Sequence, residues 1–449
     1  MKNIVVLGAG ESGLGAAMLA RQKDYAVFVS DAGQISSARK AEMERLEIAF
    51  EEGKHSEEKI LSADLIIKSP GISPKAELVV KASLAGIPII DELEFAFDYS
   101  KGKVIAITGT NGKTTTTLLT YHLMKEAGLD VGLAGNVGKS WAGQLLTTDH
   151  EWWVIECSSF QIDGFVDFKP AIAILCNITP DHLDRYDYKI ENYIDSKFGI
   201  FKNMMSEDRA ILFVEDRLTL QGLDKTNIGA STLWISGSSV QKAGAWTDEK
   251  MLSFAVTDQS VHVSVDSLSI KGKHNLLNAL FAGSAALIAG VNEMELEKGF
   301  QTFKNAPHRM ELIREMDGVK FINDSKGTNV EATAYALASY GNPLIWIAGG
   351  VDKGNDYSVL APLVANVKSL ICLGKDNEKL KKAFAEEIAD IRETQDIAEA
   401  VNWGQELGES GDVVLLSPAC ASFDLFKNYE DRGMQFRVAV ENLKPKAIA

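Results

Sequence analysis

The stretch VIAITGTNGKTTTTLLTYHLMKEAG (residues 104–128) joins a short β-branched run to a helical segment through a glycine-rich loop. In such a loop the backbone N–H groups and the following helix N-terminus can hold phosphate, while a lysine reaches the β- and γ-oxygens and a hydroxyl ligates Mg²⁺. The loop departs from the full GxxxxGK[ST] pattern, because Ile107 stands where the first glycine is expected. Its Gly-Lys-Thr core and its strand-to-helix position still favour ATP binding over an ordinary turn. The predicted ATP-binding residues are Gly109, Thr110, Asn111, Gly112, Lys113, Thr114 and Thr115.

Outward from this loop, short apolar runs alternate with helical stretches, which is typical of parallel sheets built from βαβ units. The predicted strands cover residues 3–8, 26–31, 64–69, 104–109, 153–156, 171–176, 344–349 and 412–417. Each ends in Gly, Ser, Asp, Glu or Cys, at the sheet edge where α/β proteins bind ligands. Residues 210–270 break the alternation with the pieces TLWIS, LSFAV and VHVSV, which predict an antiparallel patch.

The length of 449 residues predicts three domains, at about 150 residues per domain. The polar stretches DYSKGK (98–103) and KNAPHRM (304–310) indicate the boundaries. We therefore expect an α/β protein with domains 1–97, 98–306 and 307–449. The first is expected to resemble a dinucleotide-binding domain, the second to be a P-loop ATPase domain carrying the antiparallel patch, and the third to be Rossmann-like.

Composition excludes several classes of protein. The net charge is −16 and no long basic run interrupts it, so the electrostatic signature of a nucleic-acid binder is missing. Four widely spaced cysteines indicate neither a disulfide framework nor a thiolate zinc site. The apolar run at the start is too short for a signal peptide, and no window approaches 18 unbroken apolar residues. We expect a cytoplasmic protein that neither crosses nor binds a membrane.

A second glycine-rich loop, GAGESG (8–13), also follows a predicted strand, and Asp31 ends the next one. This is the dinucleotide fingerprint, and it leaves a nicotinamide or flavin oxidoreductase open as an alternative. No hydride-transfer site is recognisable downstream, so a different diphosphate ligand is the favoured interpretation.

Candidate metal ligands follow two neighbouring strands. Glu156 closes WWVIE and is expected at the ligand edge beside Thr114, and His182 lies in NITPDHLDR after the next strand. Lys197 lies in the helical ENYIDSKFGIF, where an exposed helix lysine is the more common interpretation of the residue alone. In the last third, the strand-end loops FINDSKGTN (321–329), GGVDKG (349–354) and SPACASFD (417–424) indicate one cleft for an anionic small molecule.

Taken together, these motifs resemble those of the Mur ligase family, ATP-dependent amino-acid ligases that build the peptidoglycan stem peptide. The resemblance covers essentially the whole chain. Its motifs are TGTNGKTTT (108–116), GNVG (135–138), ECSSFQ (156–161), NITPDHLDRY (177–186), DSK (195–197), GKHNLLNALFA (272–282), HRME (308–311), NDSKGTN (323–329) and SPACASFDLFKNYEDRG (417–433).

Within the family, the first domain and the SPACASFD run are most similar to the D-glutamate-adding member. The resemblance implies an enzyme that joins D-glutamate to UDP-N-acetylmuramoyl-L-alanine through an acyl phosphate, releasing ADP and phosphate. It implies that Lys113 binds the β/γ-phosphates, that Thr114 and Glu156 ligate one Mg²⁺, and that His182 and a carbamylated Lys197 support a second. Asn136 would position the substrate.

The remaining implied contacts are with the three small molecules. For ATP they are Asn275, His308, Arg309 and Asp324; for D-glutamate, Lys326, Thr328, Lys353 and Ser422; for the UDP moiety, Gly10, Ser12, Asp31, Ser69 and Gly71. A monomer with no nucleic-acid partner is expected. One alternative is a folylpolyglutamate-type ligase, which shares the ATP loop but lacks the first domain. Another is a nonenzymatic nucleotide-gated binding module, which would not account for the lysine-bearing loops of the C-terminal third.

Overall fold

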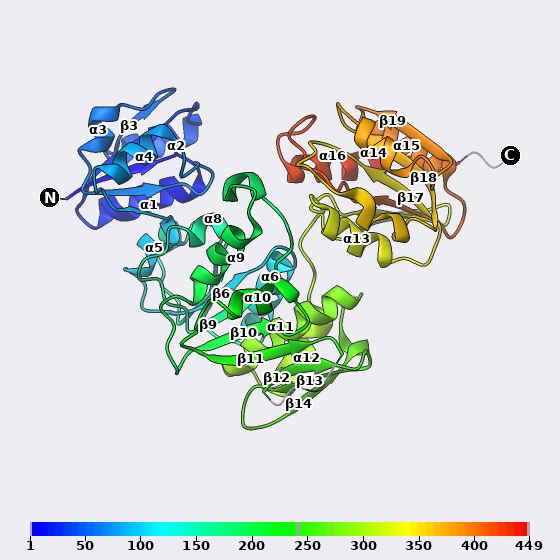
Figure 1. Cartoon of the computed structure of the whole chain (residues 1–449), viewed down its shortest axis with the longest axis horizontal. Coiled ribbons are helices and arrows are strands. Elements are labelled where there is room, and N and C mark those ends of the chain that lie inside the picture. The colour runs from blue at the N-terminus through cyan, green and yellow to red at the C-terminus, as the bar shows by residue number, and fades with distance from the viewer. Residues whose placement is uncertain (1, 239, 241–242, 271, 447–449) are drawn as a thin grey trace. The chain divides into compact units, whose positions relative to one another are not determined.

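The computed structural model describes residues 2–238, 240, 243–270 and 272–446, and these form three β-sheets flanked by helices (Figure 1). The chain has two compact units, Met1–Phe303 and Lys304–Ala449. The first unit holds two sheets and the second unit holds one. The expected α/β class is confirmed. We keep boundaries after residues 97 and 306 as a proposal, because each resulting segment contains the strands of one sheet.

The first sheet has the strand order β3-β2-β1-β4-β5, and all of its pairs are parallel. On β1, Ile4 and Val6 pack into one buried cluster while Val5 and Leu7 pack into another, so neither face of the strand meets water. Its elements are β1 (Asn3–Leu7), α1 (Glu11–Gln22), β2 (Ala26–Asp31), α2 (Ser37–Arg45), β3 (Ala49–Glu52), α3 (Glu57–Leu61), β4 (Leu65–Lys68), α4 (Glu77–Leu84), β5 (Ile89–Ile90) and α5 (Glu92–Phe97).

The second sheet has the order β14-β13-β12-β11-β10-β9-β6-β8-β7. Its strands are β6 (Lys103–Thr108), β7 (Val131–Gly135), β8 (Trp152–Glu156), β9 (Ile172–Leu175), β10 (Arg209–Phe213), β11 (Ser231–Ser236), β12 (Gly244–Thr247), β13 (Met251–Ala255) and β14 (Val261–Ser264). Its α-helices are α6 (Lys113–Glu126), α7 (Trp141–Gln144), α8 (Ser159–Ile162), α9 (Ile190–Phe198), α10 (Arg217–Leu223), α11 (Lys273–Ile288) and α12 (Glu293–Thr302). The 3₁₀ turns are η1 (Leu183–Tyr186), η2 (Gly199–Phe201) and η3 (Val265–Ser267).

The antiparallel patch is confirmed for β12, β13 and β14. The prediction was wrong for TLWIS, because β11 pairs in parallel with both β10 and β12. A strand's composition reports a pleated, partly buried surface and not the direction of its neighbours, so the sequence could not distinguish the two cases.

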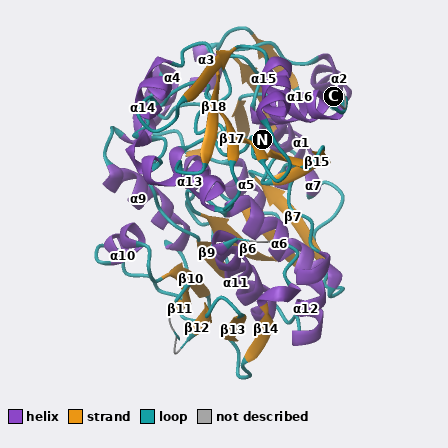
Figure 2. Cartoon of the chain, turned by 90° about the vertical axis from the view of Figure 1, so that its right-hand side faces the viewer, coloured by secondary structure: helices purple, strands orange, loops and turns teal. Residues whose placement is uncertain are grey.

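The second unit contains a sheet of order β15-β16-β20-β17-β18-β19, parallel except for the β15–β16 hairpin. On β17, Leu344, Trp346 and Ala348 face one core while Ile345 and Ile347 face the other, with helices on both sides (Figure 2). Its elements are β15 (Glu311–Met316), β16 (Val319–Asn323), α13 (Val330–Ala338), β17 (Leu344–Ala348), η4 (Tyr357–Val359), η5 (Ala361–Leu363), β18 (Val367–Leu373), α14 (Glu378–Phe384), β19 (Asp390–Thr394), α15 (Ile397–Leu407), β20 (Val413–Leu416) and α16 (Tyr429–Glu441).

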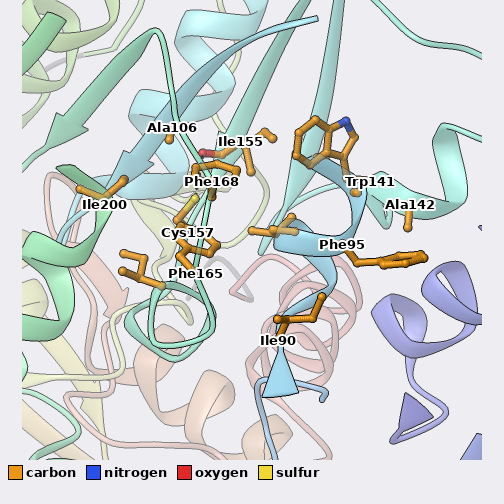
Figure 3. Packing of buried hydrophobic residues seen from close by; sticks show 14 of the residues in the cluster. Ile90, Phe95, Ala106, Trp141, Ala142, Ile155, Cys157, Phe165, Phe168 and Ile200 are labelled. Atoms are coloured by element: carbon orange, nitrogen blue, oxygen red, sulfur yellow. Dashed lines mark hydrogen bonds between the residues drawn. The ribbon is translucent and has the colours of Figure 1, made fainter. Parts of the chain in front are cut away.

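Helix α5 joins the two sheets of the first unit. Phe95 of α5 and Trp141 of α7 belong to one buried cluster that also takes in residues of β1 and β6 (Figure 3). Glu92 is buried, and its Oε1 accepts from the Ser140 hydroxyl and the Ala142 N–H, each at 2.7 Å. The link between the sheets therefore combines apolar packing with a buried carboxyl.

In the part of the chain that the structure describes, no helix has the length and apolar character needed to cross a membrane.

Glu92 makes the stability of the first unit depend on pH. Burial raises the pKa of its carboxyl to about 7, so folding favours the neutral form. The stabilisation is present below the pKa of the unfolded chain and is lost as pH rises through 7. Glutamine stays uncharged, and its carbonyl oxygen can accept the same two bonds. We compare the free energy of unfolding in urea of Glu92→Gln with that of the wild type at two pH values. The difference should shift in favour of Glu92→Gln by on the order of 2 kcal/mol between pH 5 and pH 8. A difference that does not change with pH would contradict this account.

Candidate active site

The loop between β6 and α6 has a backbone that requires glycine. Gly109 has a φ of 149° and Gly112 a φ of 82°, in the region that side chains rarely adopt. A Cβ on Gly109 would lie 2.9 Å from the Cys176 Cβ. Lys113 Nζ donates to the carbonyl oxygens of Gly109 and Thr110, both at 2.8 Å. The loop therefore fixes the Lys113 ammonium through hydrogen bonds to its own backbone carbonyls.

The loop after β9 fixes this first loop from the side. Asn177 Oδ1 accepts from the Asn111 N–H at 2.9 Å, and Asn177 Nδ2 donates to the Asn111 carbonyl at 3.1 Å. The Thr110 hydroxyl accepts from the Thr179 N–H at 2.9 Å and donates to the Thr179 carbonyl at 3.1 Å. Sequence reasoning gave Asn177 no specific role, although the residue opens a motif that it had singled out.

Glu156 lies at the carboxyl end of β8, beside β6, and is 1% exposed. Its Oε1 accepts from Asn136 Nδ2 at 2.8 Å, so the structure brings these two predicted residues together. Thr114, in the first turn of α6, is buried as well. A carboxylate and a hydroxyl are the hard oxygen donors that suit Mg²⁺.

Lys197 is buried on the inner face of α9, so the exposed-helix interpretation was wrong. Its Nζ donates to the Gly109 carbonyl at 2.8 Å and lies 4.6 Å from the centre of the Tyr193 ring. Burial, followed by repulsion from Lys113, lowers the pKa of Lys197 well below its usual range. Two lysines thus share one acceptor oxygen.

His182 precedes the turn η1 and has a φ of 52°. Its Nε2 lies 3.5 Å from an Asp181 carboxylate oxygen, and its ring meets the Phe160 ring edge-on at 5.1 Å. Across the described residues, His, Cys, Asp and Glu form no group of three or more that could hold a metal.

Helix α11 lies against α6 and brings buried amides to the phosphate loop (Figure 2). Asn278 Oδ1 accepts from the Thr116 hydroxyl at 3.2 Å, and its Nδ2 donates to Asn275 Oδ1 at 3.0 Å. A Cβ on Gly112 would come within 2.6 Å of Asn278 Oδ1. Asn275 was predicted, whereas Asn278 was missed; it follows three residues later on the same motif.

In the first sheet, Asp31 stabilises the glycine-rich loop that it was expected to accompany. Its carboxylate accepts from the Ala9 N–H at 2.6 Å and from the Gly33 N–H at 2.8 Å. Gly10 and Gly71 have no atom within 4 Å of the position where a Cβ would stand. Ser12 lies in the first turn of α1, for which Gly10 is the N-cap residue, and the Ser69 hydroxyl donates to the Gly8 carbonyl at 3.5 Å.

In the second unit, the predicted residues lie before β15 (His308 and Arg309) and after β16 (Asp324, Lys326 and Thr328), β17 (Lys353) and β20 (Ser422). Asp324 is buried, accepts from the Ser417 hydroxyl at 2.9 Å, and burial raises its pKa to about 7. His308 is buried with its Nδ1 3.0 Å from Asn323 Nδ2, while Arg309 follows it. Lys326 Nζ lies 5.1 Å from the centre of the Tyr429 ring.

A cavity of about 630 Å³ opens beside the ends of β17 and β18. It takes residues from the GGVDKG and SPACASFD loops, but none from residues 321–329, so it is not the three-loop cleft that the sequence predicted. The predicted residues Lys326, Thr328, Lys353 and Ser422 do not line it.

Arg432 is the residue of this unit that sequence reasoning missed. It is 1% exposed, and its guanidinium donates to the carbonyls of Ser325 (2.8 Å), Gly349 (3.4 Å) and Cys420 (3.3 Å). These acceptors lie in the loops after β16, β17 and β20, so one side chain joins all three. The quoted motif contained this arginine, but nothing in its spacing announced burial.

The chain matches three family models: MurD N-terminal domain over residues 3–78, Mur ligase middle domain over 107–286, and Mur ligase, glutamate ligase domain over 308–420. The chain belongs to the Mur ligase family. It is 46% identical over 443 residues to the protein named UDP-N-acetylmuramoylalanine--D-glutamate ligase of Christiangramia forsetii, covering 98% of this chain and 100% of that one.

Solved structures share the fold at lower identity. A pseudomurein peptide ligase type C from Methanothermus fervidus superposes with a TM-score of 0.64 at 18% identity, over 99% of this chain and 100% of that chain. The MurF ligase from Thermotoga maritima in complex with ADP gives a TM-score of 0.59 at 16% identity, over 92% and 95%.

The position of Arg432 predicts a large effect on the second unit. Arg432→Met leaves three buried carbonyls without this donor, and we expect a loss of about 3 kcal/mol in the free energy of unfolding of that unit. Arg437→Met is the control, because Arg437 on the same helix makes only partly exposed ion pairs, with Glu311 and Glu441. It should cost less than about 1 kcal/mol. Equal urea midpoints for both variants would contradict the joining role.

Proposed function

We propose that this chain is an ATP-dependent ligase that adds D-glutamate to UDP-N-acetylmuramoyl-L-alanine in peptidoglycan precursor synthesis. The observation that carries the proposal is similarity along the whole chain to relatives named for this activity, at 46% identity in the Christiangramia forsetii protein. The family is ATP-dependent, and the phosphate loop around Lys113 lies within its middle domain.

The chemistry follows from the weakness of a carboxylate as an acyl donor. A carboxylate oxygen of the alanyl group attacks the γ-phosphorus of ATP, the bond to the β-bridging oxygen breaks, and ADP leaves. The amine of D-glutamate then attacks the acyl carbon and loses a proton, and phosphate leaves with the electron pair of the C–O bond. The enzyme's task is to position the reactants and offset negative charge.

Lys113 and the loop amides bind the β- and γ-phosphates in this proposal. Thr114 and Glu156 hold one Mg²⁺, and His182 with carbamylated Lys197 supports a second. The buried oxygen donors of Thr114 and Glu156 fit a hard cation. Such ions supply charge neutralisation at the transferred phosphoryl group.

Carbamylation of Lys197 is supported by the state of its amine. The lowered pKa favours the neutral amine, and only a neutral amine has the lone pair that attacks CO₂. Loss of one proton then gives a carbamate anion beside Lys113. The modification places a negative charge beside the Lys113 ammonium, which a protonated Lys197 would instead repel.

The other contacts are assigned by ligand. Asn136 donates a hydrogen bond to Glu156. In the proposal, Asn136 positions the substrate near the acyl centre. The proposal assigns contacts with ATP to Asn275, His308, Arg309 and Asp324. It assigns contacts with the UDP moiety to Gly10, Ser12, Asp31, Ser69 and Gly71, and contacts with D-glutamate to Lys326, Thr328, Lys353 and Ser422. A cytoplasmic location and a monomeric state remain predictions.

The choice of amino acid tests the function directly. We expect ADP release from the wild type with UDP-N-acetylmuramoyl-L-alanine and D-glutamate, but not efficiently with L-glutamate, L-alanine or meso-diaminopimelate. Lys326→Ala should raise the KM for D-glutamate at least about tenfold, because it removes a charge-assisted partner, with the KM for ATP nearly unchanged. Lys320→Ala, on an exposed position of β16, is the control. Efficient use of L-alanine or diaminopimelate would overturn the D-glutamate assignment, and no turnover with any of them would overturn the ligase.

Lys197 offers a chemical rescue. Lys197→Ala should reduce turnover at least about a hundredfold, because the site loses its anion, and a short carboxylic acid in solution should restore part of the activity. Lys202→Ala removes an exposed lysine nearby and should leave turnover unchanged. A fully active Lys197→Ala protein would reject the carbamate.

A further inference from the structure

The turn after β4, Ser69–Ile72, presents three successive carbonyl oxygens to one arginine. Arg185 Nη2 donates to the Pro70 carbonyl at 3.2 Å and to the Ile72 carbonyl at 3.4 Å, while Nη1 donates to the Gly71 carbonyl at 3.2 Å. Arg185 lies in η1, which belongs to the second sheet's part of the first unit. The contact therefore joins the proposed UDP turn to the segment that begins with His182.

Arg185 also contacts the ring of Phe160, and this ring in turn contacts His182. Its guanidinium carbon lies 4.3 Å from the centre of the Phe160 ring, a cation–π contact. His182 also contacts that ring, edge-on, at 5.1 Å between ring centres. Phe160 belongs to α8, which follows Glu156 by three residues. Arg185 and His182 thus contact a common ring.

The backbone around η1 is strained. His182, Asp187 and Tyr188 have φ values of 52°, 57° and 56°, although none of them is glycine. Such conformations persist only where surrounding contacts hold them, and they concentrate at functional sites. An ion pair between Lys75, just beyond the turn, and Asp187 provides a second contact between the same two segments.

The contact also orients the turn. In a trans peptide the C=O and the N–H point in opposite directions, so a Pro70 carbonyl aimed at Arg185 directs the Gly71 N–H away from it. Apart from its chain neighbours, nothing lies within 4 Å of the position where a Cβ on Gly71 would stand. Lys68 Nζ supports the turn from the first sheet by donating to the Ile72 carbonyl at 3.0 Å.

We propose that Arg185 is a positioning residue that couples the substrate-holding turn Ser69–Ile72 to the His182 loop, so that binding of the nucleotide substrate and alignment of His182 support each other. This inference rests on the proposed function, since that function assigns the turn to the UDP moiety and His182 to phosphoryl transfer. Arg185 touches neither reacting group; it acts through the turn on one side and through Phe160 on the other.

The test compares Arg185→Ala and Arg185→Lys with wild type in ADP-release kinetics. We expect Arg185→Ala to raise the KM for UDP-N-acetylmuramoyl-L-alanine and to lower kcat, each at least tenfold, with the KM for D-glutamate within twofold. Arg185→Lys keeps the positive charge but loses the planar guanidinium with its several N–H donors. Its KM and kcat should therefore lie between those of Arg185→Ala and the wild type. A change in KM alone or in kcat alone would overturn the coupling. If Arg185→Ala does not fold, Arg185→Lys carries the same test, with at least threefold changes expected in both constants.

Arg209→Ala is the matched control, because Arg209 donates to the neighbouring carbonyls of Glu207 and Asp208. It should leave both constants within twofold of wild type. Equal losses in Arg209→Ala and Arg185→Ala would indicate a general effect of removing an arginine and overturn the proposal.

A second measurement separates positioning from a structural role. In a His182→Asn background, adding Arg185→Ala should lower the residual kcat by less than twofold, because the residue that it aligns is already gone, yet still raise the KM for the nucleotide substrate. A further tenfold loss of kcat in that background would overturn the route through His182. Absence of ADP release by the wild type would instead reject the proposed function. Calorimetry with UDP-N-acetylmuramoyl-L-alanine would then test only the contact between Arg185 and the turn Ser69–Ile72. We expect Arg185→Ala to bind this molecule at least tenfold more weakly than the wild type does. Equal binding by the two proteins would overturn the role of Arg185 in positioning the turn.

Discussion

The carbonyl oxygen of Gly109 accepts from both Lys113 and Lys197, and the candidate site is organised around this one acceptor. Two cationic ammonium groups so close in a buried site repel each other strongly, since little water remains to screen them. Burial, followed by this repulsion, lowers the pKa of Lys197, so the deeper of the two amines gives up its proton more readily. The lowered pKa favours the neutral amine in Lys197, while Lys113 is the lysine that is proposed to bind phosphate. Two lysine side chains thus contact the same backbone oxygen, yet different roles are proposed for them.

This arrangement depends on loops that are fixed before any ligand arrives. Asn177 satisfies both backbone groups of Asn111, and Asn278 fills the space that a side chain at Gly112 would need. In the second unit, Arg432 gives the carbonyls of three separate loops a common donor. A buried polar group without a partner is costly, so these amides and this guanidinium hold the loops in defined conformations. Preorganised loops are what stabilisation of a charged transition state requires.

The parallel sheets explain why these loops meet. Every central strand is apolar on both faces, so helices must cover both sides and the polar loops are confined to the strand ends. In the first unit, the buried cluster around Phe95 and Trp141 runs from β1 to the second sheet. That continuous core holds the turn after β4 within reach of Arg185, and the proposed coupling depends on this contact.

The sequence by itself determined the α/β class, the predicted parallel strands, the phosphate loop and the family, because apolar periodicity and glycine-dependent turns are local properties that a linear pattern records. Only the tertiary structure decided that β11 continues the parallel part of its sheet, that Lys197 is buried, and that Arg432 and Arg185 join separate loops. Each of these depends on which segments, distant in sequence, pack against the residue. Hydrogen-bond partners, pKa values and the direction of a strand outside the βαβ alternation are set by such neighbours, and one-dimensional spacing does not record them.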